Sequence, residues 1–196
     1  MQNVQNVDVP LLLLCGAPGA GKSSVGWEVY WSLLREDVPV AHVDLDGIGY
    51  GPPGHSGSFD LKFENVAVLW GSYSDAGASA FVVSGLRALP EDVLACSASV
   101  PGSVSTVVVL TVTAEEQRNR ILRRANTEYA LERGGGSSAQ SPEALEQVVA
   151  AAQQELEREA GDIPHALMLD TVGVPVVELA RQLLLTTGWP GSQSEA

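Results

Sequence analysis

The chain has 196 residues, of which 45% are hydrophobic and 18% charged, so it fits one globular domain that buries most of its apolar surface. Its 24 acidic residues outnumber its 11 basic residues and give a formal net charge of -13. Nucleic acids and anionic membranes require a basic surface, so this charge argues against a general binder of either.

The cysteines and the N-terminal segment bear on the cellular compartment. Cys15 and Cys96 show neither metal-site nor redox-pair spacing, which favours reduced thiols. The polar start, MQNVQNVDVP, lacks the basic and apolar segments of a signal peptide, and no apolar run is long enough to span a bilayer. We therefore expect a cytoplasmic protein.

The first predicted strand, Leu11–Cys15, leads into a glycine-rich loop. Gly16 to Ser23 reads G-x-x-x-x-G-K-S, the P-loop or Walker A pattern, and Ser24–Arg35 can form the helix that this motif requires. The glycines let successive backbone N–H groups point at a phosphate chain, which the helix dipole also favours. The residues expected to bind the nucleotide here are Gly16, Ala17, Pro18, Gly19, Ala20, Gly21, Lys22, Ser23 and Ser24.

Two side chains of this loop carry specific chemistry. Lys22 would place a positive charge at the β- and γ-phosphates, and the Ser23 hydroxyl suits Mg²⁺. A glycine-rich turn can match the pattern by chance, but the preceding strand and the following helix favour a true P-loop. The motif therefore predicts a nucleoside triphosphate site.

The rest of the chain alternates between strands and helices. Further strands are predicted at Val38–Leu45, Ala80–Ser84, Thr106–Val112 and Ala166–Leu169. Helices are predicted at Leu61–Ala76 and Pro90–Ala95, after the N-cap Thr113 as far as the Gly134–Gly136 run, from Ser141 to about Ala160, and at Val174–Thr187. The stretch GIGYGPPGHSGS after the second strand is predicted to be a loop.

This alternation predicts an α/β protein with a P-loop NTPase fold. We expect one domain, residues 1–196, with a five-stranded, mainly parallel sheet and helices on both faces. The run LLLLC lacks polar alternation, so its strand should be buried on both sides. Residues 189–196 are expected to form a flexible tail.

Two carboxylates close the second predicted strand, Asp44 and Asp46 in HVDLDG. Ligands of such sheets bind beyond the carboxyl ends of the strands, and alternation would point both side chains the same way. One could hold Mg²⁺ through water, and the other could accept a proton from a substrate hydroxyl. An exposed turn is the alternative, because Asp46-Gly47 is a turn signal.

The third predicted strand ends in Ser84-Gly85, without the aspartate that follows the corresponding strand of many motor and switch NTPases. No N-K-x-D guanine signature occurs either. A GTPase or a mechanical ATPase is therefore disfavoured.

With GAPGAGKSS, HVDLDG, VVSGLR and the arginine-bearing helix after Thr113, the sequence resembles the small P-loop kinases. These include adenylylsulfate, shikimate and gluconate kinases, chloramphenicol phosphotransferase and the nucleoside monophosphate kinases. The layout, with LWGSY and the closing TGWP, is closer to uncharacterised kinase-like ATP-binding proteins of actinobacteria. No clear acceptor signature of adenylate, shikimate or adenylylsulfate kinase is present.

The resemblance implies roles for particular residues. Asp46 would face the substrate, Asp44 would lie nearer the metal, and Ser84 and Arg87 would bind the acceptor. The turn at Asp170-Thr171 would lie near the adenine, with Asp170 among the nucleotide-binding residues. Residues 114–141 would form a lid that closes over ATP, hinged near the glycine run.

The lid helix carries Arg118, Arg120, Arg123 and Arg124, a large share of the scarce basic residues. Arg120, Arg123 and Arg124 can share one face and stabilise a phosphoryl group, and Arg120 and Arg124 are the first candidates for catalysis. A solvated helix, with nearby glutamates as partners, is the alternative.

Aromatic residues at helical spacing favour core packing over a ligand site. This prediction covers Trp27, Trp31, Trp70 and Tyr73. His42 and His165 are interpreted as structural, and His55 as a surface residue that could touch an acceptor.

These features favour an ATP-dependent phosphotransferase that moves the γ-phosphate to a hydroxyl of a small molecule, with ATP and Mg²⁺ as its cofactors. A regulatory or assembly ATPase without such an acceptor is the alternative. We expect a monomer or homodimer that binds neither nucleic acid nor membrane.

Overall fold

The computed structural model describes residues 8–52, 59–125, 142–158 and 163–190. Its centre is a five-stranded parallel sheet in the order β2-β3-β1-β4-β5. The strands are β1 (Val9–Cys15), β2 (Val40–Asp44), β3 (Ala80–Leu86), β4 (Ser103–Thr111) and β5 (Leu167–Asp170). The predicted fold class is therefore confirmed, and each predicted strand overlaps an observed one.

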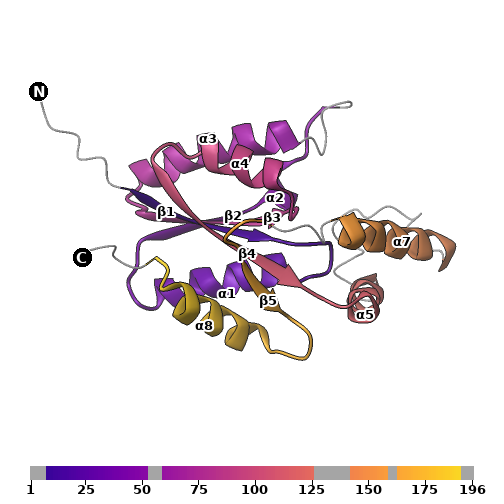
Figure 1. Cartoon of the computed structure of the whole chain (residues 1–196). Helices are drawn as coiled ribbons and strands as arrows, with labels where there is room; N and C mark the ends of the chain where they lie inside the picture. Colours follow the sequence, from indigo (N-terminus) through magenta and orange to yellow (C-terminus); the bar gives the residue numbers. More distant parts are fainter. Residues whose placement is uncertain (1–7, 53–58, 126–141, 159–162, 191–196) are drawn as a thin grey trace, which may run out of the picture.

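Helices cover both faces of the sheet (Figure 1). On one face lie α1 (Lys22–Leu34) and α8 (Val176–Thr187), and on the other lie α3 (Phe59–Asp75) and α4 (Pro90–Ala98). Beyond the end of the sheet where β4 leads into α5, the helices α5 (Ala114–Ala125) and α7 (Pro142–Arg158) lie side by side. This end holds the carboxyl termini of the parallel strands and thus the P-loop.

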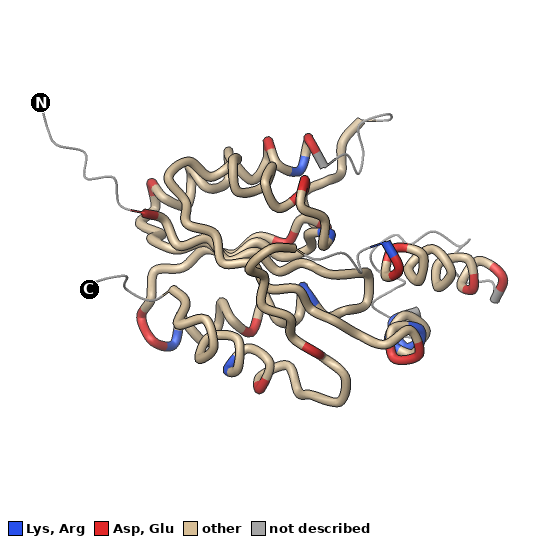
Figure 2. The backbone as a smooth tube through the Cα atoms, in the orientation of Figure 1, with Lys and Arg blue, Asp and Glu red and all other residues tan. Residues whose placement is uncertain are grey.

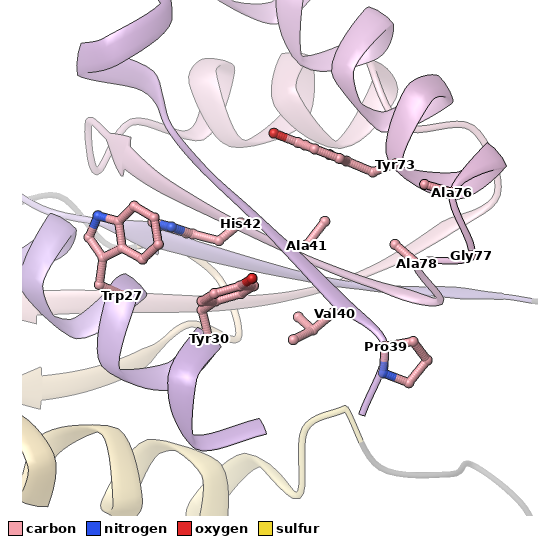
Figure 3. A pocket seen from close by; sticks show the side chains of 10 residues that line it. All are labelled: Trp27, Tyr30, Pro39, Val40, Ala41, His42, Tyr73, Ala76, Gly77 and Ala78. Atoms are coloured by element: carbon pink, nitrogen blue, oxygen red, sulfur yellow. The ribbon is translucent and has the colours of Figure 1, made fainter. Parts of the chain in front are cut away.

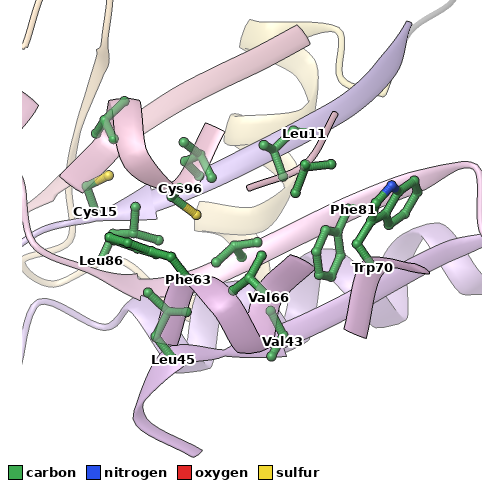
Figure 4. Packing of buried hydrophobic residues seen from close by; sticks show 14 of the residues in the cluster. Leu11, Cys15, Val43, Leu45, Phe63, Val66, Trp70, Phe81, Leu86 and Cys96 are labelled. Carbon is green, nitrogen blue, oxygen red and sulfur yellow. The ribbon is translucent and has the colours of Figure 1, made fainter. Parts of the chain in front are cut away.

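The central strand β1 is buried on both sides, as its unbroken apolar run predicts. Leu11 and Leu13 face the core under α3 and α4, whereas Leu12 and Leu14 face the core under α1 and α8. Figure 4 shows the first of these cores. Because both faces of β1 are fixed by packing, the loop that follows starts from a rigid support.

The apolar face predicted for α3 is confirmed. Val66 and Trp70 are buried, and Leu69 and Tyr73 pack against the same core. The Trp70 ring stacks on Phe81 of β3 with a centroid distance of 5.2 Å. Gly77, just beyond the helix, adopts a φ of 100°, the left-handed conformation typical of a residue that ends a helix.

Several local predictions were wrong. Residues 45–48 form a helical turn, α2 (Leu45–Ile48), where a strand end and a loop were expected. Trp27 and Trp31 are 49% and 46% exposed and do not belong to the core. Helix α4 extends past its predicted end at Ala95 to Ala98 and includes Cys96. Trp189 is buried in the core with α8, so the expected tail cannot begin there.

Other predictions lie outside the described residues. These are the loop at 53–58 with His55, and the part of the lid at 126–141 with the glycine run. In the ranges that the structure describes, no helix has both the length and the apolar character needed to cross a membrane.

Candidate functional site

The P-loop begins where β1 ends, and its backbone conformation requires glycine. The N–H of Gly16 donates a 3.2 Å hydrogen bond to the carbonyl oxygen of Leu86 at the end of β3. Gly16 has a φ of 136°, and a Cβ atom there would lie 2.5 Å from the carbonyl oxygen of Leu110. A side chain at this position is therefore excluded by both strain and collision.

The N-terminus of α1 is left open for an anion. Gly21 is its N-cap, no side chain caps it, and no acidic residue lies in its first turn. The Lys22 ammonium donates to the carbonyl oxygens of Gly16 and Ala17, the latter at 3.1 Å, so it lies back across the loop. Ser23 and Ser24 belong to the same turn, where backbone N–H groups and the helix dipole favour phosphate.

Gln117 of α5 joins the lid helix to the loop, a role that the sequence did not reveal. Its side chain is fully buried, and its Nε2 donates to the carbonyl oxygens of Pro18 at 2.8 Å and Ala152 at 3.0 Å. The amide therefore connects the P-loop, α5 and α7. The predicted helix start is also confirmed, since the Thr113 hydroxyl accepts a 3.3 Å hydrogen bond from the N–H of Glu116.

Arg120 forms a second link between α5 and the loop. Its guanidinium donates to the carbonyl oxygens of Gly19 and Ala20, each at 3.2 Å. It also donates to the hydroxyl of Thr171 at 2.9 Å and to the carbonyl oxygen of Thr171 at 2.8 Å. Thr171 is buried and its hydroxyl donates to the carbonyl oxygen of Thr111, so the partner of Arg120 is itself fixed.

A pocket of about 510 Å³ opens beside this contact, and we call it the Arg120 pocket. Its walls combine P-loop residues, three lid arginines and an apolar segment from the turn after β5 into α8. The lining includes Gly19, Ala20, Gly21, Ser24, Arg120, Arg123, Arg124, Thr171, Val174, Pro175 and Leu179. A cationic side joined to an apolar side suits a ligand with phosphates and a planar base.

Glu116 balances part of the charge in this pocket. Its carboxylate accepts hydrogen bonds from Arg120 and Arg123, each at 2.9 Å. The hydrogen bond from Arg120 is the main cause that lowers the pKa of Glu116. Arg118 instead forms two 2.6 Å hydrogen bonds with Glu146 of α7. Figure 2 shows acidic and basic positions close together on these two helices. The arginines are therefore divided between the pocket and a helix–helix contact.

Asp170 does not line the Arg120 pocket. Its side chain is exposed and accepts a 3.1 Å hydrogen bond from the N–H of Val172, which shapes the turn. The neighbouring Thr171 lines the pocket instead. Within the turn after β5 it is therefore Thr171, and not Asp170, that faces the pocket.

Asp44 and Asp46 lie at the carboxyl end of β2, but not in the predicted geometry. The strand ends at Asp44, whose Oδ1 accepts a 2.9 Å hydrogen bond from the N–H of Asp46 and caps α2. Asp46 is helical, so strand alternation does not describe the pair. Its exposed carboxylate lies 3.5 Å from the Nζ of Lys62, a buried lysine that the sequence analysis missed. The carboxylates remain together at this edge of the sheet.

Gly85 of β3 lies between the end of β1 and Asp44 at the end of β2. Leu14 pairs with Ser84 whereas Cys15 pairs with Leu86, so the register between β1 and β3 shifts at Gly85. This glycine has a φ of 92°, and a Cβ atom there would lie 3.1 Å from Oδ1 of Asp44. Irregular strand pairing of this kind often occurs beside functional sites, where it changes the direction of the side chains. The strand β3 therefore lies between the P-loop and Asp44, and its register shift is next to both.

Ser84 and Arg87 are both engaged within the protein. Ser84 is fully buried, and its hydroxyl lies 3.1 Å from the Nε2 of His42, so it is not placed to bind an acceptor. His42 is structural, as predicted, and burial lowers its pKa to about 4. Arg87 forms a two-fold ion pair with Asp92 of α4 at 2.6 and 2.8 Å.

No model of a protein family matches the chain, and no curated protein sequence matches it. The fold does match solved structures. A gluconokinase from Sinorhizobium meliloti 1021 aligns over 91% of both chains, with a TM-score of 0.58 and 19% identity. The APS kinase of Mycobacterium tuberculosis, in complex with AMPPNP and APS, aligns over 92% of this chain and 98% of its own, with a TM-score of 0.58 and 18% identity.

The shikimate kinase of Acinetobacter baumannii, in complex with shikimate, aligns over 96% of this chain and 97% of its own, with a TM-score of 0.50 and 16% identity. All three are small P-loop kinases. At these identities the likeness shows the fold, and at that level it confirms the resemblance drawn from the sequence.

Proposed function

We propose that the protein transfers the γ-phosphoryl group of ATP to a hydroxyl group of a small molecule. The observation that carries this proposal is the placement of Asp44 and Asp46 at the same end of the sheet as the P-loop. Gly16 forms a hydrogen bond with Leu86 of β3, and Asp44 of β2 pairs with Ser84 of β3. Only one strand therefore separates the P-loop from the strand that ends in Asp44. The shared fold with kinases of gluconate, APS and shikimate supports the same reaction class.

The proposed reaction uses Asp46 as the base. Its carboxylate accepts the proton of the acceptor hydroxyl while the hydroxyl oxygen bonds to the γ-phosphorus. The bond between that phosphorus and the β–γ bridging oxygen breaks, and ADP leaves. Lys22, Arg120 and Arg124 balance the charge on the phosphoryl oxygens. The Asp46 carboxylate is exposed and therefore accessible to an acceptor, and its Oδ1 lies 3.5 Å from the Nζ of Lys62.

The residues beside the loop also fit a magnesium ion that arrives with the nucleotide. When bound, such an ion would offset the charge of the phosphates. It needs only one or two protein oxygens, and it prefers carboxylate and hydroxyl ligands. The Ser23 hydroxyl and the Asp44 carboxylate are donors of this kind, although one oxygen of Asp44 already caps α2.

An acceptor screen tests the proposal. ADP release from ATP would be measured alone and with sugars, sugar acids, amino alcohols and nucleosides. We expect at least one class to raise the rate by about tenfold or more, which is a barrier change near 1.4 kcal/mol. Mass spectrometry would then show that acceptor with one added phosphoryl group.

Two outcomes would count against the proposal. One is ADP release at the same rate with every acceptor, and the other is recovery of all transferred phosphate as inorganic phosphate. Either would favour the regulatory ATPase. Lys22→Ala should abolish both activities, so it serves as the control for ATP-dependent signal and does not separate the two hypotheses.

A further inference from the structure

Helix α1 is apolar on the face that it turns away from the sheet. Trp27, Trp31 and Leu34 are spaced by four and three residues, so they share this outer face, and each is more than a third exposed. The opposite face packs into the core through Val29 and Leu33. Exposed apolar side chains gathered on one face typically mark an interaction surface. With Tyr30 at the flank, these residues form what we call the α1 face.

The α1 face continues onto the free edge of the sheet. Trp27 and Tyr30 line a pocket of about 410 Å³ together with β2 and the end of α3, as Figure 3 shows. In the described part of the chain, β2 pairs with β3 alone, so its other edge is open. The Trp27 ring meets His42 and Tyr30 edge-on, at centroid distances of 4.7 and 5.6 Å, and is thus held in place while half exposed.

The charged residues beside the α1 face favour a second copy of this chain as its binding partner. The chain carries a net charge of -13, yet the aromatic surface itself has no charged residue. Glu28 and Arg35 flank it and lie 3.4 Å apart. Along the helix, Glu28 precedes Trp31 by as many positions as Arg35 follows Ser32. If a second α1 were laid antiparallel on the first, Glu28 of each copy would approach Arg35 of the other.

We propose that the α1 face is the interface of a homodimer, with two antiparallel α1 helices across a two-fold axis near Trp31. In such an isologous contact the same surface serves both copies. Trp27 of each copy would pack near Leu34 of the other, and the flanking charges would pair twice. Aromatic anchors with a polar rim are the usual anatomy of a specific interface. Two copies of this acidic chain can approach one another at the α1 face because the residues of that face are uncharged.

Sedimentation velocity of the full chain tests the dimer. We expect the wild-type protein to sediment as a dimer, and Trp31→Glu to weaken self-association by at least about 100-fold, as for a central anchor residue. Leu94→Glu is the matched control, because Leu94 is 70% exposed on α4 and the substitution adds the same charge. The control should remain a dimer. Thermal unfolding of each variant, and a parallel Trp31→Ala variant, would separate loss of association from loss of folding.

A charge-swap mixture tests the antiparallel arrangement itself. Glu28→Arg and Arg35→Glu each place like charges across the two-fold axis, so each variant alone should be monomeric. Their equimolar mixture should form a heterodimer, because the two positive side chains of one variant would then face the two negative side chains of the other. The intrachain pair is broken in both variants, so only contacts between chains can restore assembly.

Three results would overturn the proposal. The first is a wild-type chain that stays monomeric at every concentration, as when another protein or residues outside the described ranges cover the α1 face. The second is a Trp31→Glu variant that dimerises as well as the control. The third is a mixture of the two charge variants that does not assemble.

Discussion

The guanidinium of Arg120 donates a 2.9 Å hydrogen bond to the hydroxyl of Thr171, although 51 positions separate the two residues in the chain. The same guanidinium donates to carbonyl oxygens of Gly19 and Ala20 in the P-loop. One side chain therefore holds α5, the loop and the turn after β5 in a fixed relation. A displacement of α5 would therefore also disturb the P-loop, the site proposed for the nucleotide.

Thr171→Val should weaken this coupling. The substitution keeps the shape of a buried side chain but removes the hydroxyl that joins Arg120 to the carbonyl oxygen of Thr111. We expect a loss of about 1–2 kcal/mol in the free energy of unfolding. The affinity for a non-hydrolysable ATP analogue should fall by about tenfold, which corresponds to 1.4 kcal/mol. Urea denaturation and calorimetric titration measure the two effects.

Thr171→Ser is the matched control because it keeps the hydroxyl. It should retain analogue affinity close to that of the wild type. An unchanged affinity in Thr171→Val would show that this contact does not support the site.

Gln117→Leu should weaken the contacts of α5 with the P-loop and α7. The buried amide bonds to the carbonyl oxygens of Pro18 and Ala152, and leucine would leave both without this donor. We expect a loss of about 1–3 kcal/mol in unfolding free energy. Hydrogen exchange at the amides of the P-loop and α7 should also become faster.

Arg118→Ala provides the comparison on the same helix. Its ion pair with Glu146 is exposed, and water screens such pairs, so its loss should change the free energy of unfolding very little. A Gln117→Leu variant no less stable than Arg118→Ala would contradict the assigned role of the buried amide.

His42 should make stability depend on pH. Burial is the main cause that lowers its folded-state pKa from 6.5 to about 4, while the nearby Asp44 acts in the opposite direction. Between these values the unfolded chain binds the proton more strongly than the folded chain does. Stability from the neutral imidazole is thus complete above pH 6.5 and is lost as the pH falls toward 4, by no more than about 3 kcal/mol.

The variant His42→Gln separates this effect from the protonation of carboxylates. It keeps a polar partner for Ser84 but does not titrate in this range. Urea denaturation at pH 7 and pH 5 should show a smaller loss of stability for the variant than for the wild type. Equal losses would mean that His42 is not the titrating group.

Local sequence determined the parts of the structure that were predicted well. The apolar run from Leu11 to Leu14 is recognisable without its neighbours because it is buried on both faces. The P-loop is equally local, since its glycines are required by backbone conformation as well as by packing. Such elements are specified by their own residues, which is why the fold class and the P-loop could be predicted from the sequence.

Features that depend on contacts between distant segments could not be predicted from the sequence. Helical spacing showed that Trp27 and Trp31 share a face, but only packing decides that this face points outward. Gln117 resembles any polar helix residue until α7 covers it. Likewise, the register shift at Gly85 arises from the pairing between β1 and β3, and no local sequence pattern predicts it.

The central claim is tested most directly by measuring phosphoryl transfer and nucleotide binding together in Asp46→Asn, using γ-labelled ATP and the acceptor found by screening. We expect the affinity for the ATP analogue to change by less than about twofold, while transfer to the acceptor falls by about 100-fold or more. Asp75→Asn, at an exposed position at the end of α3, should match the wild type in both. An Asp46→Asn variant that transfers the label as fast as the wild type would contradict the account.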